Sequence, residues 1–183
     1  MAERIKTRIP AAEFLELPES NLPRQLLDGE IIDMAAPELT HQDIVLNLGI
    51  FFRRVEKANG GKTYIAPVDV VLDDYNVPQP DALYLVPGSR CQPQGSRRLQ
   101  GPPDLIVEVL SPGSRILDRR DKFRLYQRAQ VREYWIVDPE ERQIEVWQHD
   151  GERYARLGDV FLPGETFTSA IVGVVSTDAL FNG

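Results

Sequence analysis

The residue whose position most strongly indicates chemistry is Glu108, a carboxylate inside an apolar run. Residues 105–110 read Leu-Ile-Val-Glu-Val-Leu, a pattern typical of a buried central strand. Burying a carboxylate without a partner is costly. We therefore expect either that a cation compensates Glu108 or that Glu108 faces a cleft at the end of the sheet. The alternative is a strand-edge glutamate that faces solvent.

A second carboxylate, Asp81, precedes the strand expected over residues 82–86. Strands that are neighbours in sequence are usually neighbours in space, so Asp81 and Glu108 can converge on one ion. Two carboxylates, together with water and a phosphate oxygen, form the hard oxygen set that Mg²⁺ prefers. The pair indicates a divalent-metal site, although a Pro-Asp at the start of a strand is also an ordinary turn.

A helix expected over residues 114–128 carries Asp118, Lys122 and Tyr126 on one face, because a spacing of four stacks side chains turn over turn. This helix directly follows the Glu108 strand and could lie over the strand ends. The alternative is a surface Asp–Lys pair with a half-buried tyrosine. Residues 113–133 hold seven basic and three acidic side chains, which suits either a phosphate contact or a solvated helix face.

Composition limits the classes of function. The chain has 183 residues and a net charge of −7, which argues against a protein that coats DNA but allows a nuclease with carboxylates at its centre. One cysteine, Cys91, allows no internal disulfide and favours a reducing, cytoplasmic location. No secretory signal or membrane-spanning run is expected. His41, His149 and Cys91 lack zinc-ligand spacing, and no phosphate-binding glycine loop or serine-nucleophile motif is present.

The order of elements predicts one domain over residues 1–183, of the α/β or α+β class with a mixed sheet. A helical crossover should make strands 105–110 and 134–137 parallel. The Asp-Gly turns at 28–29 and 150–151 predict antiparallel hairpins that add strands at both ends. The other expected elements are a helix over 40–57 capped by Thr40, strands over 63–72, 82–86 and 143–148, a mobile surface loop over 87–103, and short helices over 11–17 and 179–181.

Four of these segments together resemble the Uma family, a bacterial group of restriction-endonuclease-like proteins. The resemblance covers nearly the whole chain, from the Asp28-Gly29-Glu30 turn to the tail. It implies a fold of the PD-(D/E)xK type, with a mixed β-sheet core flanked by helices. The segments are Pro80-Asp81, Glu108-Val-Leu-Ser-Pro112, Asp118-x-x-x-Lys122-x-x-x-Tyr126, and Glu133-Tyr134-Trp135-Ile-Val-Asp138-Pro139.

The resemblance also implies roles for individual residues. Asp81 and Glu108 match the acidic positions of the motif and would bind Mg²⁺ or Mn²⁺. Leu110 stands where the motif places its lysine, so the catalytic lysine would be Lys122 on the following helix. Weaker candidates for substrate binding are Glu30, His41, Arg115, Asp118, Arg119 and Tyr126.

The implied function is a metal-dependent endonuclease that acts on DNA, or on RNA, as a homodimer. Leu110 keeps open the alternative of a catalytically inactive nucleic-acid-binding or regulatory module, since a fold does not dictate an activity. A small-molecule phosphodiesterase is a third class. The loop over 87–103, with Arg90, Arg97 and Arg98, could close over a substrate. The aromatic strands around Tyr134, Trp135 and Trp147 could form a dimer interface or belong to the core.

Overall fold

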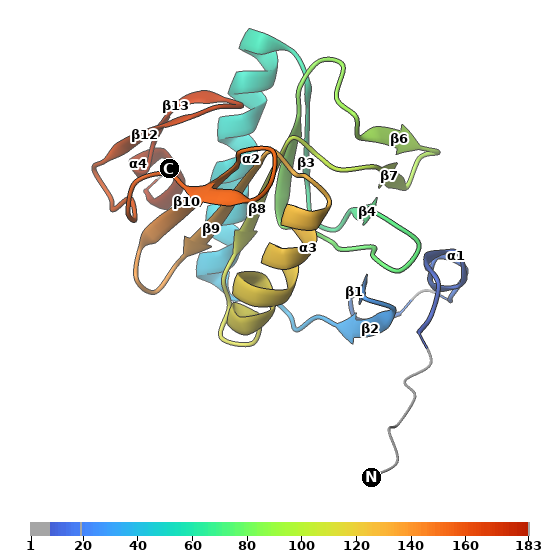
Figure 1. The fold of residues 1–183 in the computed structure, drawn as a ribbon. Coiled ribbons are helices and arrows are strands. Elements are labelled where there is room, and N and C mark those ends of the chain that lie inside the picture. Colours follow the sequence, from blue (N-terminus) through green and yellow to red (C-terminus); the bar gives the residue numbers. More distant parts are fainter. Residues whose placement is uncertain (1–7, 19, 183) are drawn as a thin grey trace.

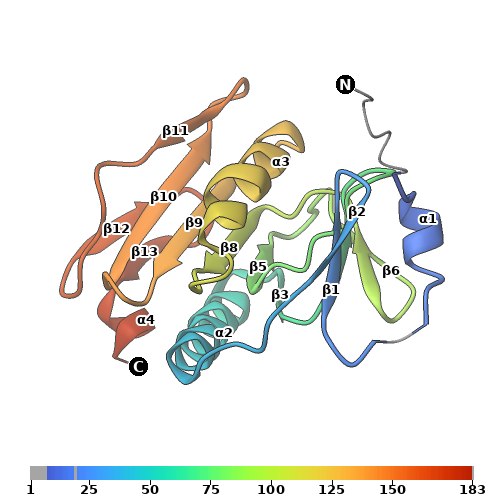
Figure 2. The same cartoon turned by 90° about the horizontal axis from the view of Figure 1, so that it is seen from below.

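The computed structural model describes residues 8–18 and 20–182. Its centre is a six-stranded sheet, and helix α2 (Leu39–Asn59) covers one face while helix α3 (Phe123–Arg128) covers the other, as Figures 1 and 2 show. The mixed sheet between helices that the sequence predicts is therefore present. From one edge to the other the strands are β11 (Tyr154–Arg156), β10 (Gln143–His149), β9 (Glu133–Asp138), β8 (Leu105–Val109), β5 (Ala82–Leu85) and β3 (Lys62–Ile65).

Strand β8 lies in the interior of this sheet, with all five of its residues buried. It pairs antiparallel with β5 and parallel with β9. The parallel pairing is the one that the helical crossover predicted. The continuous apolar run of β8 follows from burial on both faces.

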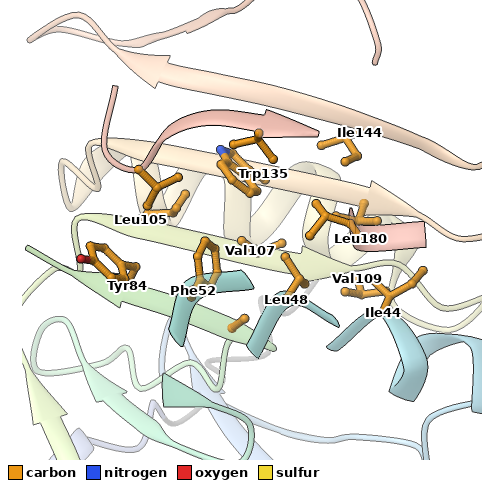
Figure 3. Close-up of a cluster of buried hydrophobic side chains, with 14 of the residues drawn as sticks. Ile44, Leu48, Phe52, Tyr84, Leu105, Val107, Val109, Trp135, Ile144 and Leu180 are labelled. Carbon is orange, nitrogen blue, oxygen red and sulfur yellow. The ribbon is translucent and has the colours of Figure 1, made fainter. Parts of the chain in front are cut away.

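The side chains of β8 alternate between the two helices. Leu105, Val107 and Val109 pack in one buried cluster with residues of α2 such as Leu48 and Phe52 (Figure 3). The intervening residues Ile106 and Leu110 pack in a second cluster, with residues of α3. Because side chains on a strand alternate with a period of two, Glu108 points to the α3 face of the sheet.

Two expected segments differ from the structure. The strand expected over 63–72 is two strands, β3 and β4 (Asp69–Val71), which belong to different sheets. The loop expected over 87–103 contains β6 (Gln92–Gln94) and β7 (Arg98–Gln100), which form a three-stranded sheet with β4. The three side chains of β6 are exposed, so the segment has a loop-like composition, whereas the buried side chains of Cys91 and Leu99 anchor it to the core.

The two helices next to the sheet begin differently from the prediction. Helix α2 begins at Leu39 after Glu38 and has no side-chain cap, so the expected Thr40 cap is wrong. The helix expected over 114–128 begins with a π-helical turn, η1 (Leu117–Lys122), and continues as α3. Hydrogen bonds from residue i+5 to residue i widen such a turn, and π-helical turns are frequent at functional sites.

The ends of the chain add smaller elements. The Asp28-Gly29 turn joins β1 (Arg24–Leu27) to β2 (Glu30–Asp33), as predicted. The sequence did not predict the pair β12 (Thr166–Ser169) and β13 (Gly173–Ser176). Short helices α1 (Ala11–Phe14) and α4 (Asp178–Phe181) lie near the two ends. Among the described residues, no helix is long and apolar enough to cross a membrane.

Candidate active site

Glu108 and Asp81 lie at one end of neighbouring antiparallel strands. Ala82 pairs with Val107, so Asp81 and Glu108 occupy the next pair of positions along β5 and β8. The Val109 N–H donates a 2.7 Å hydrogen bond to Asp81 Oδ2, which holds the Asp81 carboxylate against β8. The two carboxylates that the sequence singled out are therefore brought together.

Lys122 reaches the same place from the helical side. Its Nζ lies 2.9 Å from Glu108 Oε2 and 3.2 Å from Asp118 Oδ1. The Tyr126 hydroxyl donates a 2.6 Å hydrogen bond to Glu108 Oε1. Asp118, Lys122 and Tyr126 therefore face the sheet, and the surface Asp–Lys pair considered as an alternative is wrong.

The π-helical turn is part of this placement. The carbonyl of Asp118 accepts hydrogen bonds from the Phe123 N–H, five residues ahead, and from the buried Tyr134 hydroxyl at 3.1 Å. The hydroxyl of Tyr134 thus ties η1 to strand β9. The same turn directs the Asp118 and Lys122 side chains inward, to the buried Glu108.

His41 comes from the first turn of α2 on the opposite face of the sheet. It is buried, and its Nε2 lies 3.3 Å from Asp81 Oδ2. Burial lowers the pKa of His41, but the hydrogen bond and the charge of Asp81 outweigh burial, so the pKa is raised. Sequence alone left His41 as a weak substrate-binding candidate, whereas its observed contact is with the Asp81 carboxylate.

The cluster brings three acidic side chains, Asp81, Glu108 and Asp118, close to Lys122. Burial raises the pKa of Glu108 to about 8; Lys122 and Tyr126 oppose this rise, and Asp118 and Asp81 add to it. Burial works to lower the pKa of Lys122, but Glu108, Asp118 and Asp81 outweigh it and raise that pKa above its ordinary value. Two acidic side chains, Glu108 and Asp118, thus contact the Lys122 ammonium, which stays protonated.

These residues fit a divalent cation. Asp118 Oδ1 is buried, with the Lys122 ammonium 3.2 Å away but no hydrogen bond, and a cation nearby would add a second positive charge to this group of acids. Each of the two Glu108 oxygens makes one of the contacts described above and keeps a second lone pair, whereas Asp81 Oδ2 already contacts both the Val109 N–H and His41. Among residues 8–18 and 20–182, no group of three or more histidine, cysteine, aspartate or glutamate side chains is placed to hold a metal ion. Water and substrate would therefore complete the coordination, which is how Mg²⁺ is commonly held.

The remaining substrate-binding candidates are not part of the buried cluster. Glu30 is exposed at the start of β2. Arg115 forms ion pairs with Asp138 and Glu140, while Arg119 forms them with Asp138 and Glu145. The sequence analysis missed these carboxylates as partners of the arginines. The available signal for Asp138 was the Asp138-Pro139 pair at the end of β9.

A cavity of about 270 Å³ adjoins this cluster. His41, which contacts Asp81, and Leu110, two residues beyond Glu108, line it together with Arg115. Asp81 and Glu108 do not line the cavity, and His41 is the residue that connects it to Asp81. Of the two readings of the aromatic strands, dimer interface or core, the core reading is confirmed for Tyr134 and Trp135, which are fully buried.

The sequence and the fold of the chain are similar to those of known proteins. A family model named Uma2, with the description "Putative restriction endonuclease", matches residues 11–176. An uncharacterized protein of Synechocystis sp. is 26% identical over 152 residues, which are 79% of this chain and 76% of that protein.

A solved structure from Anabaena variabilis shares the fold. It is described as a "putative nuclease belonging to DUF820" and superposes with a TM-score of 0.79 at 21% identity, over 95% of this chain and 98% of that one. The likeness confirms the predicted mixed-sheet fold of the restriction-endonuclease-like type.

Proposed function

The chain belongs to the Uma2 family, as the resemblance predicted, and from this premise we propose that it is a metal-dependent endonuclease that hydrolyses DNA phosphodiester bonds. The observation that carries the proposal is the direction of Lys122. Its ammonium points to Glu108, 2.9 Å away, rather than to solvent. A lysine exposed on the helix would instead have favoured a module without turnover. We further propose that residues 1–183 act as one domain.

Asp81 and Glu108 are the residues that would hold Mg²⁺ or Mn²⁺. When bound, such an ion supplies a water of lowered pKa and polarises a phosphoryl oxygen. The surrounding residues fix the two carboxylates. Tyr126 donates to Glu108, while the Val109 N–H donates to Asp81. This support matters because an active site needs its groups held in place before the substrate arrives.

Lys122 would stabilise the negative charge that develops on the phosphoryl group during hydrolysis. A lysine ammonium is a compact charge with three donors, so it can serve both the phosphate and a carboxylate. Asp118, 3.2 Å from Nζ, helps to keep the ammonium protonated and directed inward. Because the side chain of Lys122 is buried, a phosphate would contact it only deep in the site, next to Glu108 and Asp118.

The test is cleavage of supercoiled plasmid by purified protein with Mg²⁺ or Mn²⁺. We expect the wild type to nick or linearise the plasmid, EDTA to stop it, and Glu108→Gln and Lys122→Met to be inactive. The matched control is Lys62→Met, which removes an exposed lysine that also pairs with a glutamate. It should cleave as the wild type does, and circular dichroism should show that all variants fold.

The outcomes separate the competing functions. If Glu108→Gln is inactive while Lys122→Met is active, the metal site stands and the role of the lysine is wrong. If the wild type shows no cleavage above the level of both variants, the endonuclease proposal fails. The alternative is then the nucleic-acid-binding or regulatory module, which a DNA-binding measurement would test. We keep the homodimer as a prediction, and sedimentation equilibrium would test it.

A further inference from the structure

The cavity next to the carboxylate cluster contains an arginine that is held in place from behind. Arg115 Nη1 and Nη2 donate to the two oxygens of Asp138, at 2.8 and 3.1 Å. Asp138 is buried and also accepts the N–H groups of Glu140 and Glu141. A bidentate pair with such a fixed partner sets the plane of the guanidinium. Arg115 therefore presents its remaining donors in a fixed direction.

One of those donors is hydrogen-bonded to an exposed carboxylate. Arg115 Nη2 donates a 2.6 Å hydrogen bond to Glu140 Oε2. The Glu140 side chain is 65% exposed, whereas that of Asp138 is 1% exposed. An exposed ion pair contributes little to stability, so Glu140 can leave Arg115 at low cost while Asp138 stays. Both Arg115 and Glu140 line the cavity, together with His41 and Ser111.

We propose that Glu140 occupies the place of a nucleic-acid phosphate on Arg115, and that substrate binding exchanges the carboxylate for the phosphodiester. The exchange is chemically conservative, because a guanidinium binds carboxylate and phosphate oxygens with the same donor geometry. The site would take a phosphodiester next to the one being cleaved, since His41 links the cavity to Asp81. This inference rests on the proposed nucleic-acid substrate.

The exchange explains how an arginine already paired with two acids can still bind substrate. It also gives Glu140 a role as an internal competitor. A single free anion must displace Glu140 using one contact, whereas a nucleic-acid strand carries further phosphates that can bind other cationic side chains at the same time. The competitor thus favours long polyanions over small ones.

The experiment measures binding of a fluorescently labelled DNA duplex by anisotropy at low salt, in the presence of EDTA. We expect Glu140→Gln to bind about two- to fivefold more tightly than wild type, the range set by the worth of an exposed ion pair. Arg115→Gln should bind more weakly than wild type. In the Arg115→Gln background, Glu140→Gln should have no effect, because the competitor has lost its target.

Asp33→Asn is the matched control. Asp33 pairs with Arg24 at 3.1 Å, with side chains 60% and 35% exposed, against 65% and 33% for Glu140 and Arg115. It removes the same unit of negative charge, but neither residue lines the cavity. Its DNA affinity should change less than that of Glu140→Gln. If Arg115→Gln unfolds in a thermal melt, Arg115→Lys replaces it, because lysine keeps a cation beside buried Asp138. Adding Glu140→Gln to Arg115→Lys should then raise the DNA affinity by less than Glu140→Gln raises it in the wild type.

Two results would overturn the inference. One is an equal gain in affinity for Asp33→Asn and Glu140→Gln, which would mean a general charge effect. The other is a gain for Glu140→Gln that persists in full without Arg115. Failure of the proposed function is distinguishable, since it is read from plasmid cleavage. Cleavage without any effect of Glu140→Gln on binding would leave the endonuclease standing and remove the exchange.

Discussion

Replacing Lys122 by methionine should destabilise the metal-free protein by an amount that the buried charges set. The Lys122 and Glu108 side chains are 4% and 2% exposed, and their charged atoms are 2.9 Å apart. Removing one partner of a buried pair costs about 3–5 kcal/mol, because the other charge is left uncompensated. Methionine keeps most of the side-chain volume, so the loss of charge dominates.

The size of the effect is limited by protonation. Burial raises the pKa of Glu108 to about 8 although Lys122 lowers it, so near neutral pH the carboxyl group is already largely protonated, and losing the ammonium raises this pKa further. We therefore expect the lower end of that range, about 3 kcal/mol, which is a fall of about 6–12 °C in Tm for a chain of this length. The double variant Glu108→Gln/Lys122→Met should be more stable than Lys122→Met alone.

Urea denaturation in EDTA measures the free energy of unfolding of each variant. Lys62→Met is the control, since Lys62 is 64% exposed and its pair with Glu56 lies at the surface. It should cost less than about 1 kcal/mol. If Lys122→Met costs no more than Lys62→Met, or if the double variant is as unstable as the sum of both single variants, the buried ion pair is not the feature that organises the cluster.

Two further predictions concern stability away from the cluster. Gly61 has φ +89°, and a Cβ there would meet the Leu85 carbonyl and lie 2.7 Å from the Tyr84 hydroxyl. Gly61→Ala should therefore lower the free energy of unfolding, measured by urea denaturation, by about 2–4 kcal/mol. The control Gly88→Ala should lower it by about 1 kcal/mol, because φ is also positive there but the space is open. Burial works to raise the pKa of Glu56, but hydrogen bonds from Lys62 and the Thr63 N–H, with the charge of Arg53, lower it overall. The carboxylate therefore adds stability above its unfolded pKa, and this stability is lost as pH falls through the lower folded pKa. Melts from pH 7 to pH 3 should show a smaller acid loss for Glu56→Gln than for wild type, and an equal loss would contradict the assignment.

Sequence predicts the central strands well because their pattern has one physical cause. The run around Glu108 is apolar on both faces, and a strand buried on both faces requires this. The helical crossover then determines the parallel pairing with β9. Asp81 and Glu108 could be paired from strand order alone, although only the structure gives their register.

Other features depend on contacts that no local pattern contains. The strands β6 and β7 are short and expose polar side chains, so their segment is indistinguishable by composition from a loop. The π-helical turn depends on the Tyr134 hydroxyl, which bonds the Asp118 carbonyl from a different strand. The partners of Arg115 are 23 and 25 residues away in the chain. Charge counts along the helix predicted a basic face, but they could not predict that acids from elsewhere neutralise it.

The origin of the lysine has a consequence for how this centre can vary. Because the ammonium comes from the helical layer, position 110 on the strand side is left to Leu110, which is buried with Leu125 in the core. The sheet layer therefore fills the apolar interior at this point, and the helical layer supplies the positive charge. Substitutions in the turn over 117–122 can retune the position of the charge without opening a hole beside β8. A lysine at position 110 would instead replace a buried apolar side chain that packs in the core.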